Sequence, residues 1–173
     1  MSNTETKWKQ SKQWSDQFLP EIKRILGEHL IREGTIEEDT KQNTDLIVLT
    51  LNPIRIACRI RKHQHLNKGN RANEFTIRKN VPSGNPSEMR KIWNGWGDYF
   101  FYGFSNETET AIQKWFIGDL EIFRNFVKQR YNETKKIPAT TMINTDGSSD
   151  FYVFKLADMP DNFLLADSNI YMP

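Results

Sequence analysis

The sequence predicts an α+β or α/β domain in which helices flank a mixed β-sheet. Apolar residues recur every three or four positions in residues 14–31 and 120–131, which is the period of an amphipathic helix. Short runs rich in β-branched and aromatic residues lie at 44–51, 55–63, 74–79, 97–105 and 114–119, and they favour strands. Because helices and strands alternate in small groups along the chain, the all-helical and all-β classes fit poorly.

One globular domain over residues 13–173, preceded by a polar leader over residues 1–12, accounts for the length. A chain of 173 residues is long enough for one hydrophobic core and too short for two domains of ordinary size. Aromatic residues make up 12% of the chain, and each can bury about 150–250 Å². We therefore expect residues 1–12 to be disordered and the remainder to fold as one unit.

The helix of residues 14–31 precedes three strands in the predicted order. Residues 44–51, TDLIVLTL, are apolar on both faces and predict a buried central strand. Asn52-Pro53 then predicts a turn, so the next strand begins after it, antiparallel to its predecessor if the connection is a hairpin. The third strand places Phe75 and Ile77 on one face.

The second half of the predicted domain contains two strands between two helices. A helix begins near Ser87, with Ser87 or Asn85 as its N-cap. Residues 97–105 form a strand that is apolar on both faces. Residues 114–119 form a strand that runs into the last helix, for which Asp119 is the predicted N-cap.

The strand of residues 55–63 carries arginines on one face. Arg55, Arg59 and Arg61 point the same way, and Thr76 and Arg78 of the next strand can fall on that face. Residues 55–91 hold ten lysines and arginines against two glutamates, although the net charge of the chain is only +2. Because burial of an unpaired guanidinium costs several kcal/mol, this face must meet carboxylates or open to solvent.

Two interpretations of the arginine face follow. On an open face the guanidinium groups can recognise nucleic-acid phosphates, with Arg55, Lys62, Arg78 and Lys79 as the binding residues. On a structural face they are instead neutralised within the chain, by Glu21, Glu28 and Glu74.

Carboxylates near the predicted strand starts suggest a metal site. Asp45 immediately precedes the first strand, Asp98 begins the strand of residues 97–105, and Asp39 lies in an acidic segment upstream. Mg²⁺ prefers oxygen ligands and keeps several waters, which suits phosphodiester chemistry. The other interpretation is that Asp39 lies in a solvated loop and that Asp45 and Asp98 cap turns.

The segment WNGWGDYFFYGF, residues 93–104, combines aromatic residues with glycines. It can be a base-stacking platform, but we expect it to form core and turn. Trp93 and Trp96 are the expected anchors if the partner is a protein. Cys58 alternates with the arginines, so we expect it to face the apolar side and lie in the core.

The sequence lacks the motifs of several function classes. A single cysteine excludes a disulfide within the chain and a multi-cysteine zinc site. No glycine-rich phosphate loop, G-x-S-x-G elbow or HExxH motif is present, which disfavours NTPases, serine hydrolases and zincins. The sequence shows no apolar targeting segment and no membrane span, so we expect a cytoplasmic protein without membrane contact. It leaves the oligomeric state open.

The segment EEDTKQNTDLIVLTLNPIRIACRIRKH, followed by EFTIRK, resembles small phage and bacterial proteins related to the PD-(D/E)XK nuclease-like domains, over residues 14–104. The resemblance implies a restriction-endonuclease-like core, Mg²⁺ as cofactor, Asp45 as the first metal-binding acid and Glu28 or Glu21 as the helical glutamate. The chain departs from the family where the (D/E)-x-K motif is expected, because it reads Cys58-Arg59-Ile60-Arg61 there. Arginine stays protonated and cannot easily share a proton with an attacking water.

Two function classes remain as expectations. The first is a Mg²⁺-dependent phosphodiesterase acting on DNA, with Asp45, Arg59 and Arg61 as catalytic residues. Its metal ligands would come from Asp39, Asp45 and Asp98, or from Glu74. The second is a non-catalytic module that binds nucleic acid or a protein partner, such as a phage or defence-related accessory factor.

Overall fold

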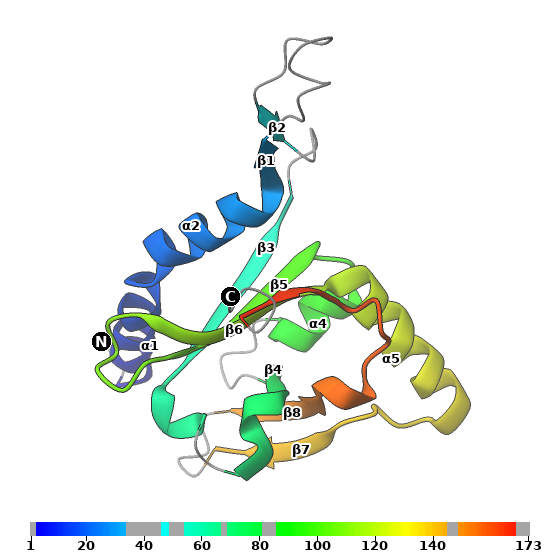
Figure 1. The fold of residues 1–173 in the computed structure, drawn as a ribbon. Helices are drawn as coiled ribbons and strands as arrows, with labels where there is room; N and C mark the ends of the chain where they lie inside the picture. Colours follow the sequence, from blue (N-terminus) through cyan, green and yellow to red (C-terminus); the bar gives the residue numbers. More distant parts are fainter. Residues whose placement is uncertain are drawn as a thin grey trace, which may run out of the picture.

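A computed structural model describes residues 3–33, 46–48, 54–66, 69–80, 86–144 and 149–168 (Figure 1). Its helices are α1 (Asn3–Asp16), α2 (Leu19–Leu30), α4 (Glu88–Trp93) and α5 (Leu120–Thr134). Its strands are β1 (Ile31–Glu33), β2 (Leu46–Val48), β3 (Ile56–Arg61), β4 (Glu74–Asn80), β5 (Tyr99–Ser105), β6 (Ile112–Asp119), β7 (Thr140–Ile143), β8 (Asp150–Lys155) and β9 (Leu164–Asp167). Short 3₁₀ turns lie at η1 (His63–His65), η2 (Gly69–Asn73) and η3 (Leu156–Asp158).

The described strands form three sheets, so the prediction of an α+β fold with a mixed sheet is confirmed. One sheet has the order β3-β5-β6-β9, a second has the order β4-β8-β7, and β1 pairs with β2 in a two-stranded ribbon. β3 and β5 run parallel, whereas the other pairs are antiparallel. α1 and α2 lie on the side of β3 opposite α5 (Figure 1).

β5 is buried on both faces, as its sequence predicts, and it separates two clusters of apolar side chains. Phe101 faces the smaller cluster, which contains Ile22 and Ile25 of α2. Phe100 and Tyr102 face the larger cluster, which α4, α5, β4 and β8 complete. The alternation of side chains along one strand therefore serves both halves of the core.

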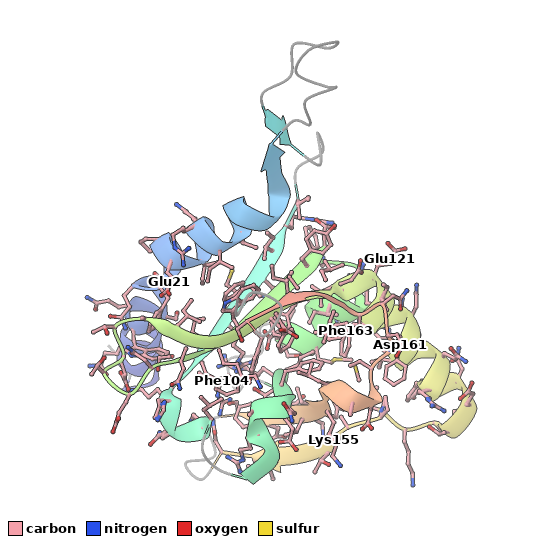
Figure 2. All side chains as sticks on the ribbon, viewed as in Figure 1. Glu21, Phe104, Glu121, Lys155, Asp161 and Phe163 are labelled. Atoms are coloured by element: carbon pink, nitrogen blue, oxygen red, sulfur yellow. The ribbon has the colours of Figure 1, made fainter. Side chains whose placement is uncertain are left out.

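Phe75 of β4 lies at the centre of the larger cluster. Its ring lies within 6.3 Å, centroid to centroid, of the rings of Phe100, Tyr102, Phe116, Phe123, Phe154 and Phe163. Phe104 and Phe163 lie in the interior, and Lys155 and Asp161 lie at the periphery (Figure 2). The predicted apolar face of β4 is confirmed, because Phe75 and Ile77 are both buried.

The predicted helix starts at Ser87 and Asp119 are confirmed. The Ser87 hydroxyl accepts the backbone N–H of Arg90 at 3.2 Å, which makes Ser87 the N-cap of α4. The Asp119 Oδ1 accepts the N–H groups of Glu121 and Ile122 at 2.7 and 3.0 Å. Both caps satisfy donors that the first turn of a helix leaves without partners.

The helix expected over residues 14–31 is two helices. α1 begins at Asn3, inside the segment predicted as the leader, and the chain turns between Asp16 and Leu19. Pro20 explains the break, because proline has no backbone N–H and suits only the first turn of a helix. Phe18 and Ile22 remain on the predicted apolar face, where both are buried.

The predicted hairpin between residues 44–51 and 55–63 is wrong for the strands that the structure describes. β2 pairs with β1, with Ile31 opposite Val48, and is not the central strand of a larger sheet. β3 instead pairs with β5, and Ile56 lies opposite Tyr99. β3 is therefore an end strand, and its partner is more than 40 residues away in sequence. A local turn signal such as Asn52-Pro53 cannot reveal a partner at that distance.

We expect Phe75→Ala to lower the free energy of unfolding by about 3–5 kcal/mol, because it leaves a cavity in the centre of the aromatic cluster. Urea unfolding followed by circular dichroism measures this loss. Ile143→Ala is the control: Ile143 is 68% exposed on β7, and its truncation should change stability by less than about 0.5 kcal/mol. Similar losses in the two variants would contradict the central position of Phe75.

Candidate functional site

A cleft of about 800 Å³ runs along β3. One wall comes from α1, and the other comes from α4 and the turn that follows it. Within the part of the chain that the structure describes, the lining residues are Ser11, Lys12, Trp14, Ser15, Arg55, Ile56, Ala57, Cys58, Arg59, Ile60, Arg61, Lys62, His65, Arg78, Pro86, Ser87, Glu88, Lys91, Ile92, Trp96 and Gly97. The whole of β3 thus contributes to one concave surface.

The position of β3 at the end of its sheet explains why this strand can carry arginines. Among the described strands only β5 pairs with it, so its other edge faces the cleft. Ile60 packs beneath α2, while Arg59 and Arg61 point to the face shared with β4. An end strand beside a cleft can keep guanidinium groups close to solvent, which a central strand cannot do.

The charge of the lining is strongly positive. Its cationic members are Lys12, Arg55, Arg59, Arg61, Lys62, Arg78 and Lys91. Glu88 is the single acid among the described lining residues. The structure therefore brings together five residues that the sequence nominated for phosphate contact or catalysis: Arg55, Arg59, Arg61, Lys62 and Arg78.

Four of the seven cationic residues in the described lining have an acidic partner. Lys12 pairs with Asp16, Arg55 with Asp98, Arg59 with Glu88 and Lys62 with Glu109. The pairs of Arg55 and Lys62 lie at exposed positions, where such contacts contribute little to stability. Part of the basic surface is thus neutralised within the chain, by acids other than the expected ones.

Arg61 and Arg78 have no acidic ion-pair partner among the described residues. The Nη1 of Arg61 donates to the hydroxyl of Thr76 at 3.0 Å. Burial lowers the pKa of Arg61, and Arg59 and Arg71 lower it further, against an opposing effect of Tyr102. The pKa of Arg78 is also lowered, first by burial and then by Arg59.

The environment of Arg78 is short of acceptors. Its Nε is buried and has no hydrogen-bond partner within the described ranges. Glu88 raises the pKa of Arg78 but does not outweigh the effect of burial. A guanidinium that is partly desolvated and short of acceptors gains from an anion placed beside it.

Glu88 connects three elements at the wall of the cleft. Its Oε2 accepts from Nη1 of Arg59 on β3 and, at 2.9 Å, from the backbone N–H of Arg78 on β4. Nη1 of Arg59 also donates to the carbonyl of Thr76 at 3.2 Å. One carboxylate at the start of α4 therefore fixes both strands that carry the arginines.

Of the glutamates expected to neutralise the arginine face, neither Glu21 nor Glu74 forms an ion pair with these arginines among the described residues. The Oε2 of Glu21 accepts the backbone N–H of Ile112 at 2.9 Å. Glu74 lies opposite Lys155 in the β4–β8 ladder. The side chain of Glu28 lies outside the described residues.

Asp98 is held by Arg55. Its Oδ2 accepts from the backbone N and Nε of Arg55 at 2.7 and 3.2 Å, and its Oδ1 accepts from Nη2 at 3.0 Å. These hydrogen bonds lower the pKa of Asp98. Both carboxylate oxygens thus already bind a cation of the chain itself.

The described residues do not fit a magnesium site. Asp39 and Asp45 lie outside them, and Asp98 is engaged by Arg55. In the part of the chain that the structure covers, no group of three or more histidine, cysteine, aspartate or glutamate side chains can hold a metal ion. The catalytic role of Asp45 and the metal roles of Asp39, Asp45 and Asp98 stay predictions.

Lys79 and Cys58 lie in surroundings other than those expected from the sequence. Lys79 does not line the cleft; its Nζ lies 5.4 Å from the ring centroid of Tyr152. Cys58 is exposed on the cleft wall, so its prediction as a core residue is wrong. It lies on an end strand, where the neighbouring helices do not cover the whole face. The protein atoms around it still raise the pKa of its thiol to about 11.

Trp96 lies on a turn at the edge of the cleft, within the segment expected to form core and turn. It is 61% exposed and lines the cleft, whereas Trp93 of the same segment is half-buried and packs against Tyr131. Gly95 and Gly97 flank it with φ values of +88° and +84°, in the left-handed region that favours glycine. The pattern Gly-Trp-Gly was the signal in the sequence, because it marks a turn rather than a strand.

The acidic C-terminal third does not cover the cleft in the described part of the chain. The lining ends at Gly97. Asp150 accepts from the side-chain amide of Asn80 at 3.2 Å, and Asp158 and Asp161 are exposed elsewhere. These C-terminal acids therefore do not neutralise the positive charge of the cleft lining.

Comparison of the chain with protein-family models, curated proteins and solved structures gave no match. The resemblance to nuclease-like domains therefore stays an expectation. None of the described helices combines the length and the apolar character needed to cross a membrane.

We expect the Asp98 carboxyl to titrate below about 3.9, the value for an unperturbed aspartate. Its folded-state pKa is lowered, so its contribution to stability is present above the unfolded value and is lost as the pH falls through the folded value. Arg55→Gln should move the titration upward. Carboxyl ¹³C NMR measures the shift, with Lys155→Gln as a control that leaves it unchanged. Identical midpoints in wild type and Arg55→Gln would contradict the assignment.

Proposed function

We propose that the protein binds nucleic acid by seating backbone phosphates in the cleft along β3. The observation that carries the proposal is the lining of this cleft, with seven cationic side chains and one acidic side chain in the described residues. Phosphates are the anions that a row of guanidinium groups recognises best, because the planar group can donate two parallel hydrogen bonds.

Arg61 and Arg78 are the proposed centre of the phosphate site. Burial lowers the pKa of each, and neither has an acidic partner among the residues described. A phosphate beside them would supply the missing charge and accept hydrogen bonds from the guanidinium nitrogens that face the cleft. The interaction gains strength because partial burial reduces screening by water.

The paired cations have a different role in this proposal. Arg55, Arg59 and Lys62 are held in place by Asp98, Glu88 and Glu109. Fixed side chains lose little conformational entropy when a ligand arrives. They would orient the strand of phosphates, while the cations without acidic partners supply most of the charge.

The proposal concerns binding rather than cleavage. In the resemblance to nuclease-like domains, Arg59 and Arg61 take the positions where an acid and a lysine are expected. Both can stabilise negative charge on a phosphate, but neither accepts a proton readily. This supports the non-catalytic class of the two expected functions.

Fluorescence anisotropy with a labelled oligonucleotide of about 20 nucleotides, in about 50–200 mM salt, tests the proposal. Affinity should fall steeply with salt because bound phosphates release counterions. The double variant Arg61→Gln with Arg78→Gln should bind more weakly and reduce the salt slope by about two, one for each lost contact. Lys155→Gln, which removes one positive charge at a peripheral exposed site, should bind like wild type.

Glu88→Gln provides the reciprocal test. It removes the single acid of the described lining, so affinity at low salt should increase. Thermal unfolding must be recorded in parallel, because this change also weakens the contacts to Arg59 and Arg78. Absence of binding at low salt, or wild-type affinity in the double arginine variant, would overturn the proposal.

A further inference from the structure

Trp96 is presented at the cleft by a rigid turn. A side chain at Gly97 would be strained, because φ is positive and a Cβ would lie 2.8 Å from Cδ1 of Leu120, which would have to shift. The carbonyl of Gly97 accepts from Nη1 of Arg124 at 2.9 Å. The turn is thus fastened to α5 on the core side, while the indole points away from the core and stays 61% exposed.

The indole lies next to a cation that is itself fixed. The guanidinium carbon of Arg55 lies 5.6 Å from the ring centroid of Trp96. Asp98 holds that guanidinium through two side-chain hydrogen bonds, and Arg55 also lines the cleft. An exposed aromatic ring therefore adjoins the cationic path along which we propose that phosphates lie.

The other aromatic side chain of the lining, Trp14, is engaged within the chain. Its Nε1 donates to Oε2 of Glu109 at 2.6 Å, and its ring packs edge-on against Phe18. The ammonium of Lys62 lies 5.2 Å from its ring centroid. Of the two tryptophans that line the cleft in the described residues, Trp96 is the one left exposed for a ligand.

We infer that Trp96 stacks on a base of a single-stranded polynucleotide whose phosphates occupy the cleft. The inference rests on the proposed function and names its substrate class. In a duplex the faces of the bases are already covered by their neighbours, so an indole can stack only on an unpaired base. A cationic groove with an aromatic ring beside it is the arrangement that binds single strands with little sequence preference.

The test compares three ligands of equal length: a single-stranded oligonucleotide, an abasic strand and a duplex. Trp96→Ala should weaken single-strand binding by about fivefold or more, which is the range for loss of one stacked base. Binding of the abasic strand and of the duplex, and the salt slope, should stay unchanged. Trp96→Phe should restore most of the lost affinity. A ribonucleotide strand beside the deoxyribonucleotide strand shows whether the sugar matters.

Tyr131→Ala is the matched control, because Tyr131 is a 40% exposed aromatic residue on α5 that does not line the cleft. It should bind all ligands like wild type. Wild-type affinity of Trp96→Ala for the single strand would overturn the inference, as would an equal loss on the abasic strand. If the abasic strand still binds wild type with a steep salt dependence, the proposed function survives that failure. If wild type binds none of the ligands, both fail.

Discussion

The contact between Glu88 and the two strands that carry arginines is the interaction on which the cleft depends. Its carboxylate accepts from the side chain of Arg59 and from the backbone of Arg78, so it joins β3, β4 and α4. The positive charge of Arg59 lowers the pKa of both Arg61 and Arg78, because these cations repel one another at close range. One half-buried carboxylate among several arginines offsets part of this repulsion and leaves the lining with an excess of positive charge.

The parallel pairing of β3 with β5 positions Arg59 for its contact with Glu88. β5 supplies a strand that is buried on both faces, and β3 closes the sheet beside it. A hairpin of β3 with the preceding strand would have covered the edge that faces the cleft. Because β3 pairs only with β5 among the described strands, its other edge stays open and forms part of the basic cleft.

Local patterns in the sequence predicted much of the fold. The alternation in β4, the two-sided apolar run of β5 and the caps Ser87 and Asp119 depend on residues near one another, so their signals are readable in the sequence. The partner of β3 depends on contacts across the whole chain, and the break at Pro20 was masked by an apolar stripe that continues through it.

The candidate site was predictable to a similar extent. The shared face of Arg55, Arg59, Arg61 and Arg78 follows from strand periodicity, and the structure places all four on one cleft. The sequence does not assign Glu88 to the cleft, and it offers Trp96 only as an anchor for a protein partner or as part of a stacking platform. Both residues come from the turns and helix between β4 and β5. Their positions depend on how α4 packs, and no periodic pattern encodes that packing.

The turn at Gly97 limits which substitutions and movements the core can accommodate at Trp96. Its backbone conformation, its contact with Leu120 and its hydrogen bond from Arg124 tie the position of the exposed indole to the first turns of α5. The loop is ordered when the core forms, so a ligand meets a surface whose entropy was already lost in folding. Trp96 can therefore be exchanged for another residue with little effect on the core, whereas moving it would require Leu120 and α5 to repack.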